Sequence, residues 1–269
     1  MAGYVCTIAG GKGGVGKTTT AVNVGAALEE KGHDVVVVDA DLGMANLGPM
    51  LEVEHDTSLH EVLANDATVS AALTEAVGGL TIIPGEQSLE AFADADPAEL
   101  RKVVKTLRNA YDVVLIDTGA GLSHEVAVPL GLADGIVLVT TPDDVAVSDS
   151  IKTSQLADRI DGTVIGAVLN RVNRNTDVAE IADRFYTDLL AVIPDDPQAT
   201  TDEPLIVNNP DSPAADAFRR LADSLEDVFF KGEWPENVDT VFDESWFIEE
   251  EEEVDEEEDE SGGVFGLFN

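Results

Sequence analysis

The chain has 269 residues, with 54 acids against 15 bases and a formal net charge of −39. This balance argues against a nucleic-acid-binding protein, because phosphate contacts depend on clustered Lys and Arg side chains that release counterions. The single cysteine, Cys6, excludes an intrachain disulfide bond and an iron–sulfur cluster held by a C-x-x-C motif.

Residues 11–18 read Gly-Lys-Gly-Gly-Val-Gly-Lys-Thr and match the phosphate-binding loop G-x-x-x-x-G-K-[S/T]. The apolar residues 4–9 before the loop predict a buried strand, and residues 19–28 after it predict a helix. Glycine lets the loop backbone approach a ligand closely, and the start of a helix attracts phosphate. A chance glycine-rich turn is the alternative, and the flanking strand and helix argue against it. The predicted ligand contacts are Gly11, Lys12, Gly13, Gly14, Val15, Gly16, Lys17, Thr18 and Thr19, with Lys17 at the β- and γ-phosphates and Thr18 on Mg²⁺.

A second lysine, Lys12, lies inside this loop, where a loop that holds one nucleotide does not need it. With it, the segment resembles the deviant-Walker family of P-loop ATPases, whose loop reads K-G-G-x-G-K-[T/S] and which includes MinD and ParA. In that family the extra lysine crosses a dimer interface and touches the nucleotide of the other subunit. The resemblance implies an ATP-dependent homodimer in which Lys12 and Lys17 take part in catalysis. The alternative for Lys12 is a solvated loop charge.

A valine-rich run at residues 34–38 predicts a strand that is covered on both faces, and two carboxylates follow it. Carboxylates at the carboxyl end of such a strand lie where open α/β sheets bind ligands. The resemblance to the family's D-x-D-x-G segment implies that Asp41 orients the attacking water and that Asp39 supports the Mg²⁺ shell. Simple N-capping by Asp41 is the alternative.

Residues 111–121 contain a second apolar strand, which ends in Asp117. An apolar strand that ends in Asp is the Walker-B pattern, in which the acid holds Mg²⁺ through water. The family usually reads D-x-P-A-G here, so Gly119 is a departure that adds freedom to the unfolded chain and loosens this segment. The family's final glycine is kept as Gly121, whose N–H is then available to the γ-phosphate.

Residues 164–171 predict a third strand of this kind, which ends in Asn170 and Arg171. These two residues resemble the family's adenine-recognition position, and an Asn amide can pair a donor and an acceptor with the adenine edge. Pro194 and Asp195 resemble the loop that closes over the base, although a plain turn is also consistent with their residue types.

Predicted strands alternate with helical patterns such as residues 98–110, 148–159 and 213–225. This alternation predicts an α/β fold over residues 1–231, with a mostly parallel twisted sheet and helices on both faces, as in P-loop NTPases. No basic leader precedes the first apolar run, and no run approaches the roughly 20 residues of a membrane-spanning helix. We therefore expect a cytoplasmic protein.

Residues 232–269 predict a disordered acidic tail, because the acidic block 249–260 cannot pack. The chain then ends in a short apolar segment, Val264–Phe268. MinD proteins end in a short amphipathic helix that binds membrane after ATP has dimerised them, but its usual basic residues are absent here. Three roles stay open: a weak peripheral contact with the inner face of the cell membrane, docking onto a partner protein, and an idle solubilising end.

Residues 209–218 resemble the P-x-S-P-A-A-x-A-F pattern that opens the last helix of MinD, and residues 39–47 also resemble MinD more than ParA. The resemblance implies a MinD-like ATPase that dimerises on Mg·ATP and hydrolyses it slowly, as a switch for positioning a division site or polar structures. MinD often has Arg-Asp-Ala where residues 148–150 read Ser-Asp-Ser, on the helix that binds regulators, so the regulatory or cargo protein stays open. The alternatives are a ParA-like partition ATPase on DNA and a small-molecule ATP-dependent ligase or synthetase of the same fold.

The acidic excess covers the whole chain, since residues 232–269 hold 16 acids and no base and the remainder still carries −23. Such a surface repels itself in dilute buffer, whereas the Debye length falls to about 3 Å at molar salt. With only seven lysines, this composition leads to the hypothesis of a cytosol with very high salt, as in haloarchaea.

We predict that the free energy of unfolding rises with KCl concentration, because salt screens the mutual repulsion of the carboxylates. Urea unfolding curves at about 0.1 M and about 2 M KCl measure this difference, with a rise of at least about 1 kcal/mol expected. Equal stability at the two salt concentrations would contradict the hypothesis.

Overall fold

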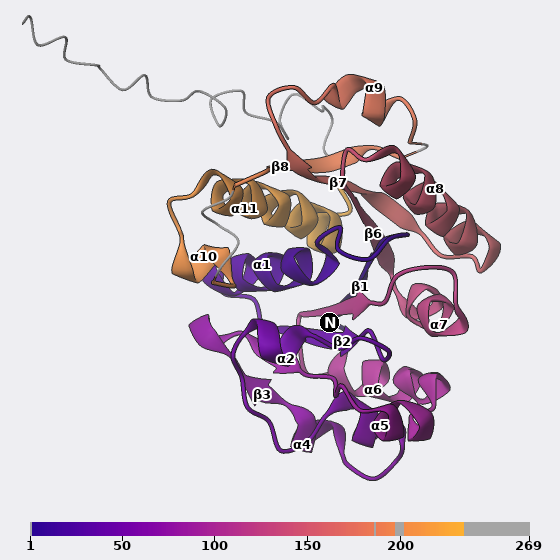
Figure 1. Cartoon of the computed structure of the whole chain (residues 1–269). Helices are drawn as coiled ribbons and strands as arrows, with labels where there is room; N and C mark the ends of the chain where they lie inside the picture. Colours follow the sequence, from indigo (N-terminus) through magenta and orange to yellow (C-terminus); the bar gives the residue numbers. More distant parts are fainter. Residues whose placement is uncertain (1, 186, 197–201, 234–269) are drawn as a thin grey trace, which may run out of the picture.

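The computed structural model describes residues 2–185, 187–196 and 202–233, and in this part of the chain eight strands form one sheet (Figure 1). The strand order is β3-β4-β2-β5-β1-β6-β7-β8. Strand β3 pairs antiparallel with β4 at one edge, and the other neighbouring pairs are parallel. The strands are β1 Tyr4–Ala9, β2 Val35–Ala40, β3 Thr74–Glu75, β4 Thr81–Ile83, β5 Val113–Thr118, β6 Gly135–Thr140, β7 Val164–Val172 and β8 Leu189–Pro194.

Helices cover both faces of the sheet (Figure 1). Helices α1, α10 and α11 pack on one face, and α3, α6, α7 and α8 pack on the other. The longer helices are α1 Lys17–Glu30, α6 Leu100–Leu107, α7 His124–Leu132, α8 Asp144–Arg159 and α11 Pro213–Glu226. The shorter elements are α2 Leu47–Met50, α3 Leu59–Leu63, α4 Val69–Ala72, α5 Leu89–Asp94, α9 Val178–Ala182, α10 Leu205–Asn208, the 3₁₀ turns η1 Val77–Gly79 and η2 Pro97–Glu99, and the π turn η3 Asp227–Lys231.

The valines of β2 show why this sheet was recognisable in the sequence. Val35 and Val37 join the core beneath α1, whereas Val36 and Val38 join the core beneath α3 and α6. All six residues of the strand are buried. Because both faces are covered, the strand begins with four consecutive valines, and the predicted doubly covered parallel sheet is confirmed.

The strand order places the functional loops at the middle of one sheet edge. Strand β1 lies between β5 and β6, and the chain crosses from β1 through α1 to β2 on one side, so the order reverses at β1. The carboxyl ends of β1, β2 and β5 lead into the phosphate loop, Asp41 and Asp117. Ligands of open α/β sheets bind at such a switch point.

Two predicted helices differ from the observed ones at their starts. The segment predicted as 98–110 begins as the 3₁₀ turn η2 and continues as α6. The segment predicted as 148–159 is the later part of α8, which begins at Asp144 because the Asp143 side chain accepts a hydrogen bond from the Ala146 N–H. The predicted domain boundary at residue 231 stays a prediction, because all but the first two residues of the predicted tail 232–269 lie outside the described residues.

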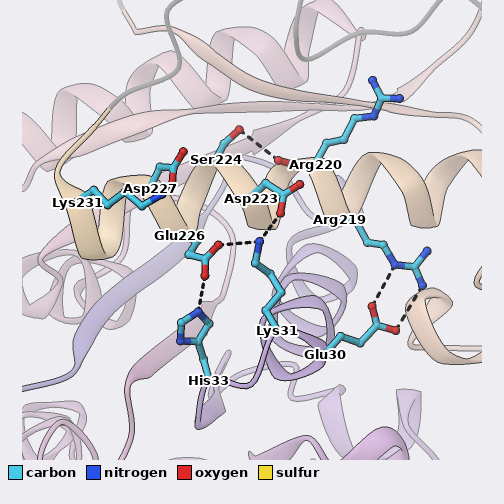
Figure 2. A network of polar contacts seen from close by, with 10 residues as sticks. All are labelled: Glu30, Lys31, His33, Arg219, Arg220, Asp223, Ser224, Glu226, Asp227 and Lys231. Atoms are coloured by element: carbon cyan, nitrogen blue, oxygen red, sulfur yellow. Dashed lines mark hydrogen bonds and ion pairs between the residues drawn. The ribbon is translucent and has the colours of Figure 1, made fainter.

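Helix α1 begins at the phosphate loop, and its far end is tied to α11 by a network of ion pairs (Figure 2). Lys31 Nζ pairs with the Asp223 carboxylate and lies 2.6 Å from Glu226 Oε2. His33 Nε2 lies 2.7 Å from the other oxygen of Glu226. Although burial lowers it, the hydrogen bonds to Asp223 and Glu226 leave the pKa of Lys31 above its ordinary value.

We predict that Lys31→Met lowers the free energy of unfolding by about 1 kcal/mol, because it leaves Asp223 and Glu226 next to each other without a cation. Affinity for nucleotide should not change, since the opposite end of α1 carries the phosphate loop. Urea unfolding at fixed salt measures the loss. The matched control is Lys102→Met, which breaks a single pair with Glu99 one turn away and should cost less than about 0.5 kcal/mol. Equal losses in the two variants would contradict this role of the network.

Candidate functional site

The phosphate loop joins β1 to α1 through glycines in conformations that other residues rarely adopt. Gly14 and Gly16 have φ angles of 77° and 97°. A Cβ at Gly16 would also lie 2.1 Å from Asn170 Nδ2, so the chain needs glycine there for space as well as for conformation. No side chain caps the start of α1 at Gly16. The first N–H groups of the helix are therefore placed to meet an anion.

The two residues that close the loop lie beside the strand ends. Lys17 is buried, with a relative exposure of 6%, although its ammonium group is charged. Thr18 Oγ1 lies 2.6 Å from Asp117 Oδ2 and 3.1 Å from Asn46 Oδ1. The predicted loop residues and the predicted Walker-B acid therefore meet, although 99 residues separate Thr18 from Asp117 in sequence.

Asp117 is an incompletely satisfied buried acid. It is fully buried at the end of β5, and its Oδ1 has no hydrogen-bond partner among the described residues. Burial and the charge of Asp39 together raise the pKa of Asp117 to about 8, against the lowering effects of Thr18 and Lys17. An unpaired buried carboxylate oxygen beside a threonine hydroxyl fits a hard divalent cation, because Mg²⁺ prefers oxygen ligands and is usually held by one or two carboxylates together with phosphates.

Asp39 faces Asp117 across the β2–β5 pair, and it has a structural task that sequence analysis missed. Its Oδ2 accepts hydrogen bonds from the N–H groups of Asn46 and Leu47 at 3.0 and 2.9 Å, and its Oδ1 accepts one from Asp41 N–H at 3.3 Å. Burial raises the pKa of Asp39 to about 6, although these backbone hydrogen bonds lower it. Asp39 therefore shapes the loop that carries Asp41.

Asp41 is partly exposed at the edge of the cleft. Its Oδ1 accepts a hydrogen bond from Met44 N–H at 3.1 Å, in the turn before α2; the N-cap of α2 is Asn46, so Asp41 does not cap that helix. A Cβ at position 119 would lie 3.1 Å from the same oxygen. The glycine that departs from the family pattern thus lies directly against the predicted water-orienting acid, and its lack of a side chain gives Asp41 room to move.

Lys12 is exposed and does not point into the site of its own subunit. Its Nζ lies 3.0 Å from Asp143 Oδ1, and this contact lowers the pKa of the Asp143 carboxyl. Asp143 is also the residue that caps α8, and the same Oδ1 accepts the Ala146 N–H. The partner of Lys12 could not be predicted from sequence, because 131 residues separate the two side chains.

Two adjoining hollows lie next to the phosphate loop. The larger one has a volume of about 590 Å³ and lies over the phosphate loop, Asp41 and Gly119. The smaller one has a volume of about 130 Å³ and is lined by predicted base contacts. Thr19 and Arg171 line both, so the hollows lie next to each other. The predicted residues that line the smaller hollow are Asn170, Arg171, Pro194 and Asp195.

Asn170 contacts the phosphate loop as well as the smaller hollow. Its Nδ2 donates to the Val15 carbonyl at 2.9 Å, and its Oδ1 accepts from Arg171 N–H at 2.9 Å. Arg171 has a φ of 57°, which is uncommon for a residue with a side chain. Gly121 has a φ of 99° on the loop after β5, where a glycine is needed to turn the backbone.

Sequence reasoning also missed a half-buried acid that lines the smaller hollow. Glu203 Oε2 accepts a hydrogen bond from Asn23 Nδ2 at 2.7 Å, and the side-chain Oδ1 of Asn23 accepts one from Ile206 N–H at 3.2 Å. Burial raises the pKa of the Glu203 carboxyl. The contact ties α1 to the segment before α10. No local pattern signals it, since Asn23 and Glu203 are 180 residues apart.

Comparisons with known proteins agree with this geometry. The family model described as an AAA domain matches residues 3–163, which is more than half of the chain. The septum site-determining protein MinD of Synechocystis sp. is 32% identical over 238 residues, which covers 82% of this chain and 88% of that protein. The chain belongs to the MinD/ParA family of P-loop ATPases.

A further relative and a solved structure show the same likeness. An uncharacterized ATP-binding protein of Methanocaldococcus jannaschii is 37% identical over 226 residues, covering 81% of this chain and 86% of that protein. The structure of MinD from Pyrococcus horikoshii, complexed with Mg-ADP, matches with a TM-score of 0.80 at 34% identity and covers 86% of this chain and 98% of that chain. The family predicted from the loop with two lysines is confirmed.

We predict that Asp117→Asn stabilises the ligand-free protein, and increasingly so as the pH rises. Because the folded pKa is raised, the folded state keeps a proton that the unfolded chain releases, so ionisation of Asp117 costs stability progressively between pH 3.8 and about 8. The variant removes this cost. We expect its melting temperature to exceed that of the natural protein by at least about 3 °C at about pH 9 and by much less at about pH 5.

Thermal unfolding of the two proteins across this pH range checks the prediction. Asp144→Asn is the matched control, since the Asp144 side chain is 87% exposed and should give no pH-dependent difference. Thermal unfolding with Mg·ATP gives a second test, because the ligand should raise the melting temperature of the natural protein more than that of Asp117→Asn. A melting-temperature difference that did not grow with pH would contradict the burial argument.

Proposed function

We propose that this chain is a MinD-like ATPase that dimerises on Mg·ATP and hydrolyses it slowly, as a switch for spatial positioning. One observation carries the proposal: the phosphate loop, Thr18 and Asp41 line a single hollow of about 590 Å³, and Thr18 Oγ1 lies 2.6 Å from the buried Asp117 carboxyl. Phosphoryl transfer needs little more than positioning and charge stabilisation, and these residue types supply both.

ATP fits the two hollows with its phosphates over the loop and its base in the smaller hollow. The N–H groups at the start of α1 and the buried ammonium of Lys17 meet the phosphates. Asn170, Arg171, Pro194 and Asp195 surround the base. Contact between Asn170 and the Val15 carbonyl links the base to the phosphate loop.

Thr18 and Asp117 are the residues that would hold Mg²⁺, with Asp39 next to them across the strand pair. When bound, the cation neutralises charge that develops on the phosphate oxygens. Asp41 lies over the same hollow and orients the attacking water, while the Gly121 N–H faces the γ-phosphate. Lys12 of the second subunit completes the charge stabilisation.

The exposed face around the loop supports a dimer. Among the described residues, Lys12 is held by one exposed pair, with Asp143, which it can exchange for a nucleotide. Three apolar side chains on the neighbouring loops and on α8 are also exposed: Met44 at 77%, Leu122 at 54% and Val145 at 56%. Large exposed apolar side chains favour an interaction surface, and a second copy of the chain would bury them.

A regulatory or cargo protein is the proposed partner that stimulates hydrolysis, and nucleic acid is not a proposed partner because of the acidic surface. Among the described residues, no helix has both the length and the apolar character needed to cross a bilayer. The predicted peripheral contact with the membrane concerns Val264–Phe268, which lies outside the described residues and stays a prediction. We propose a cytoplasmic protein that acts at the inner face of the membrane or on a polar structure.

Light scattering after size exclusion, at about 2 M KCl, tests the switch with Mg·ATP and Mg·ADP. We expect a dimer with ATP and a monomer with ADP. Lys12→Ala should stay monomeric with both nucleotides, and Asp41→Ala should form the ATP dimer but lose at least about tenfold in turnover. Lys152→Ala, another exposed lysine in an ion pair, is the matched control and should behave like the natural protein.

Two results would count against the proposal. A monomer with Mg·ATP would contradict the dimer switch. Turnover that rises with a small carboxylate substrate, and does not depend on Lys12, would favour the synthetase alternative.

A further inference from the structure

His60 is a buried histidine whose two ring nitrogens bind different loops. It lies in α3 with a relative exposure of 1%. Nδ1 accepts a hydrogen bond from Glu86 N–H at 3.0 Å, and Nε2 lies 2.9 Å from the Leu42 carbonyl oxygen. Because Nδ1 is an acceptor, the ring hydrogen lies on Nε2 and is donated to Leu42. One imidazole therefore joins the loop after β2 to the loop after β4.

The loop after β2 carries Asp41, and His60 binds it at the next residue. The other side-chain anchors from outside this loop lie further along it, where Thr18 contacts Asn46 and the exposed Gln87 donates to the Ala45 carbonyl at 2.5 Å. The contacts made by Asp41 itself are local, to the neighbouring Asp39 and Met44. His60 therefore fixes the first part of the loop from a segment distant in sequence, in addition to the buried Asp39 in β2.

The loop after β4 is a firm support for this contact. A Cβ at Gly85 would lie 2.5 Å from the Ala45 Cβ, so the two loops are in direct contact. Leu59 N–H, one residue before His60, donates to the Pro84 carbonyl at 2.7 Å. The ring is therefore held by the backbone of its own helix, by the support loop and by the buried carbonyl that it binds.

We propose that His60 is a positioning residue for ATP hydrolysis: its Nε2–H holds the Leu42 carbonyl and thereby keeps Asp41 aimed at the attacking water. The inference rests on the proposed function, in which Asp41 orients that water. Leu42 and Asp41 line the larger hollow, and His60 lies behind them. The effect therefore falls on the chemical step, and binding of nucleotide and formation of the dimer do not depend on it.

Two substitutions separate the two hydrogen bonds. The amide oxygen of Asn can replace Nδ1 as an acceptor, and the amide nitrogen of Gln can replace Nε2 as a donor. His60→Asn therefore keeps the bond from Glu86 and loses the bond to Leu42. His60→Gln keeps the bond to Leu42. The two variants therefore differ in their contact with the Asp41 loop, and both retain a polar amide in the buried site.

Kinetics of the full-length chain at molar KCl test the proposal. We expect His60→Asn to lower kcat at least about tenfold, since small misplacements of reacting groups cost up to about a hundredfold. The KM for ATP and the ATP-driven dimer should stay unchanged. His60→Gln should stay within about threefold of the natural kcat. In an Asp41→Ala background, His60→Asn should cause no further loss.

Several outcomes would overturn the inference. A natural kcat in His60→Asn would do so, as would equal losses in both variants accompanied by a raised KM, which would indicate a merely structural role. NMR of the imidazole nitrogens in the natural protein gives a test that does not depend on folding of a variant: a proton on Nδ1 in place of Nε2 contradicts the proposal. If the natural protein does not hydrolyse ATP, the proposed function fails and the inference with it. If Asp41→Ala abolishes hydrolysis but His60→Asn does not affect it, the inference alone fails.

Discussion

Two buried acids that lie side by side in the sheet are the strongest constraint on this structure. Asp39 and Asp117 are directly paired residues of β2 and β5, and both are fully buried. Burying like charges side by side is unfavourable unless protons, hydrogen bonds or a cation compensate for them. The loop after β2 donates three N–H groups to Asp39, and Thr18 contacts Asp117. Among the described residues, one oxygen of Asp117 has no hydrogen-bond partner. A bound cation would compensate for it, and this need connects the sheet to the proposed metal chemistry.

The same arrangement explains how the site is kept rigid. Helix α1 carries Thr18 at one end and the ion pairs of Lys31 at the other, so it is fixed at both ends against the sheet and α11 (Figure 2). Asp39 and His60 hold the loop of Asp41 from two sides. Precise placement matters here because phosphoryl transfer gains most of its rate from groups that are in position before the reaction. The structure thus combines a fixed frame with the exposed face that is proposed to form the dimer.

Sequence was most informative where function depends on neighbouring residues. The phosphate loop, the apolar strands and the acids that end them are local patterns, and they predicted both the sheet and the position of the site. Contacts between distant segments gave no such signal. The pair of Lys12 with Asp143, the bond from His60 to Leu42 and the contact of Gly119 with Asp41 arise only when loops meet in three dimensions.

Asp143 couples the proposed dimer to the start of helix α8. One carboxylate oxygen accepts both the Lys12 ammonium and the Ala146 N–H that starts α8. In the proposed dimer Lys12 moves to the partner's nucleotide, and Asp143 is left with the helix cap alone. A molecule that binds the start of α8 more tightly in the dimer also strengthens dimerisation. The two effects have the same size, because coupled binding equilibria are reciprocal. A regulator could therefore sense bound ATP without touching it.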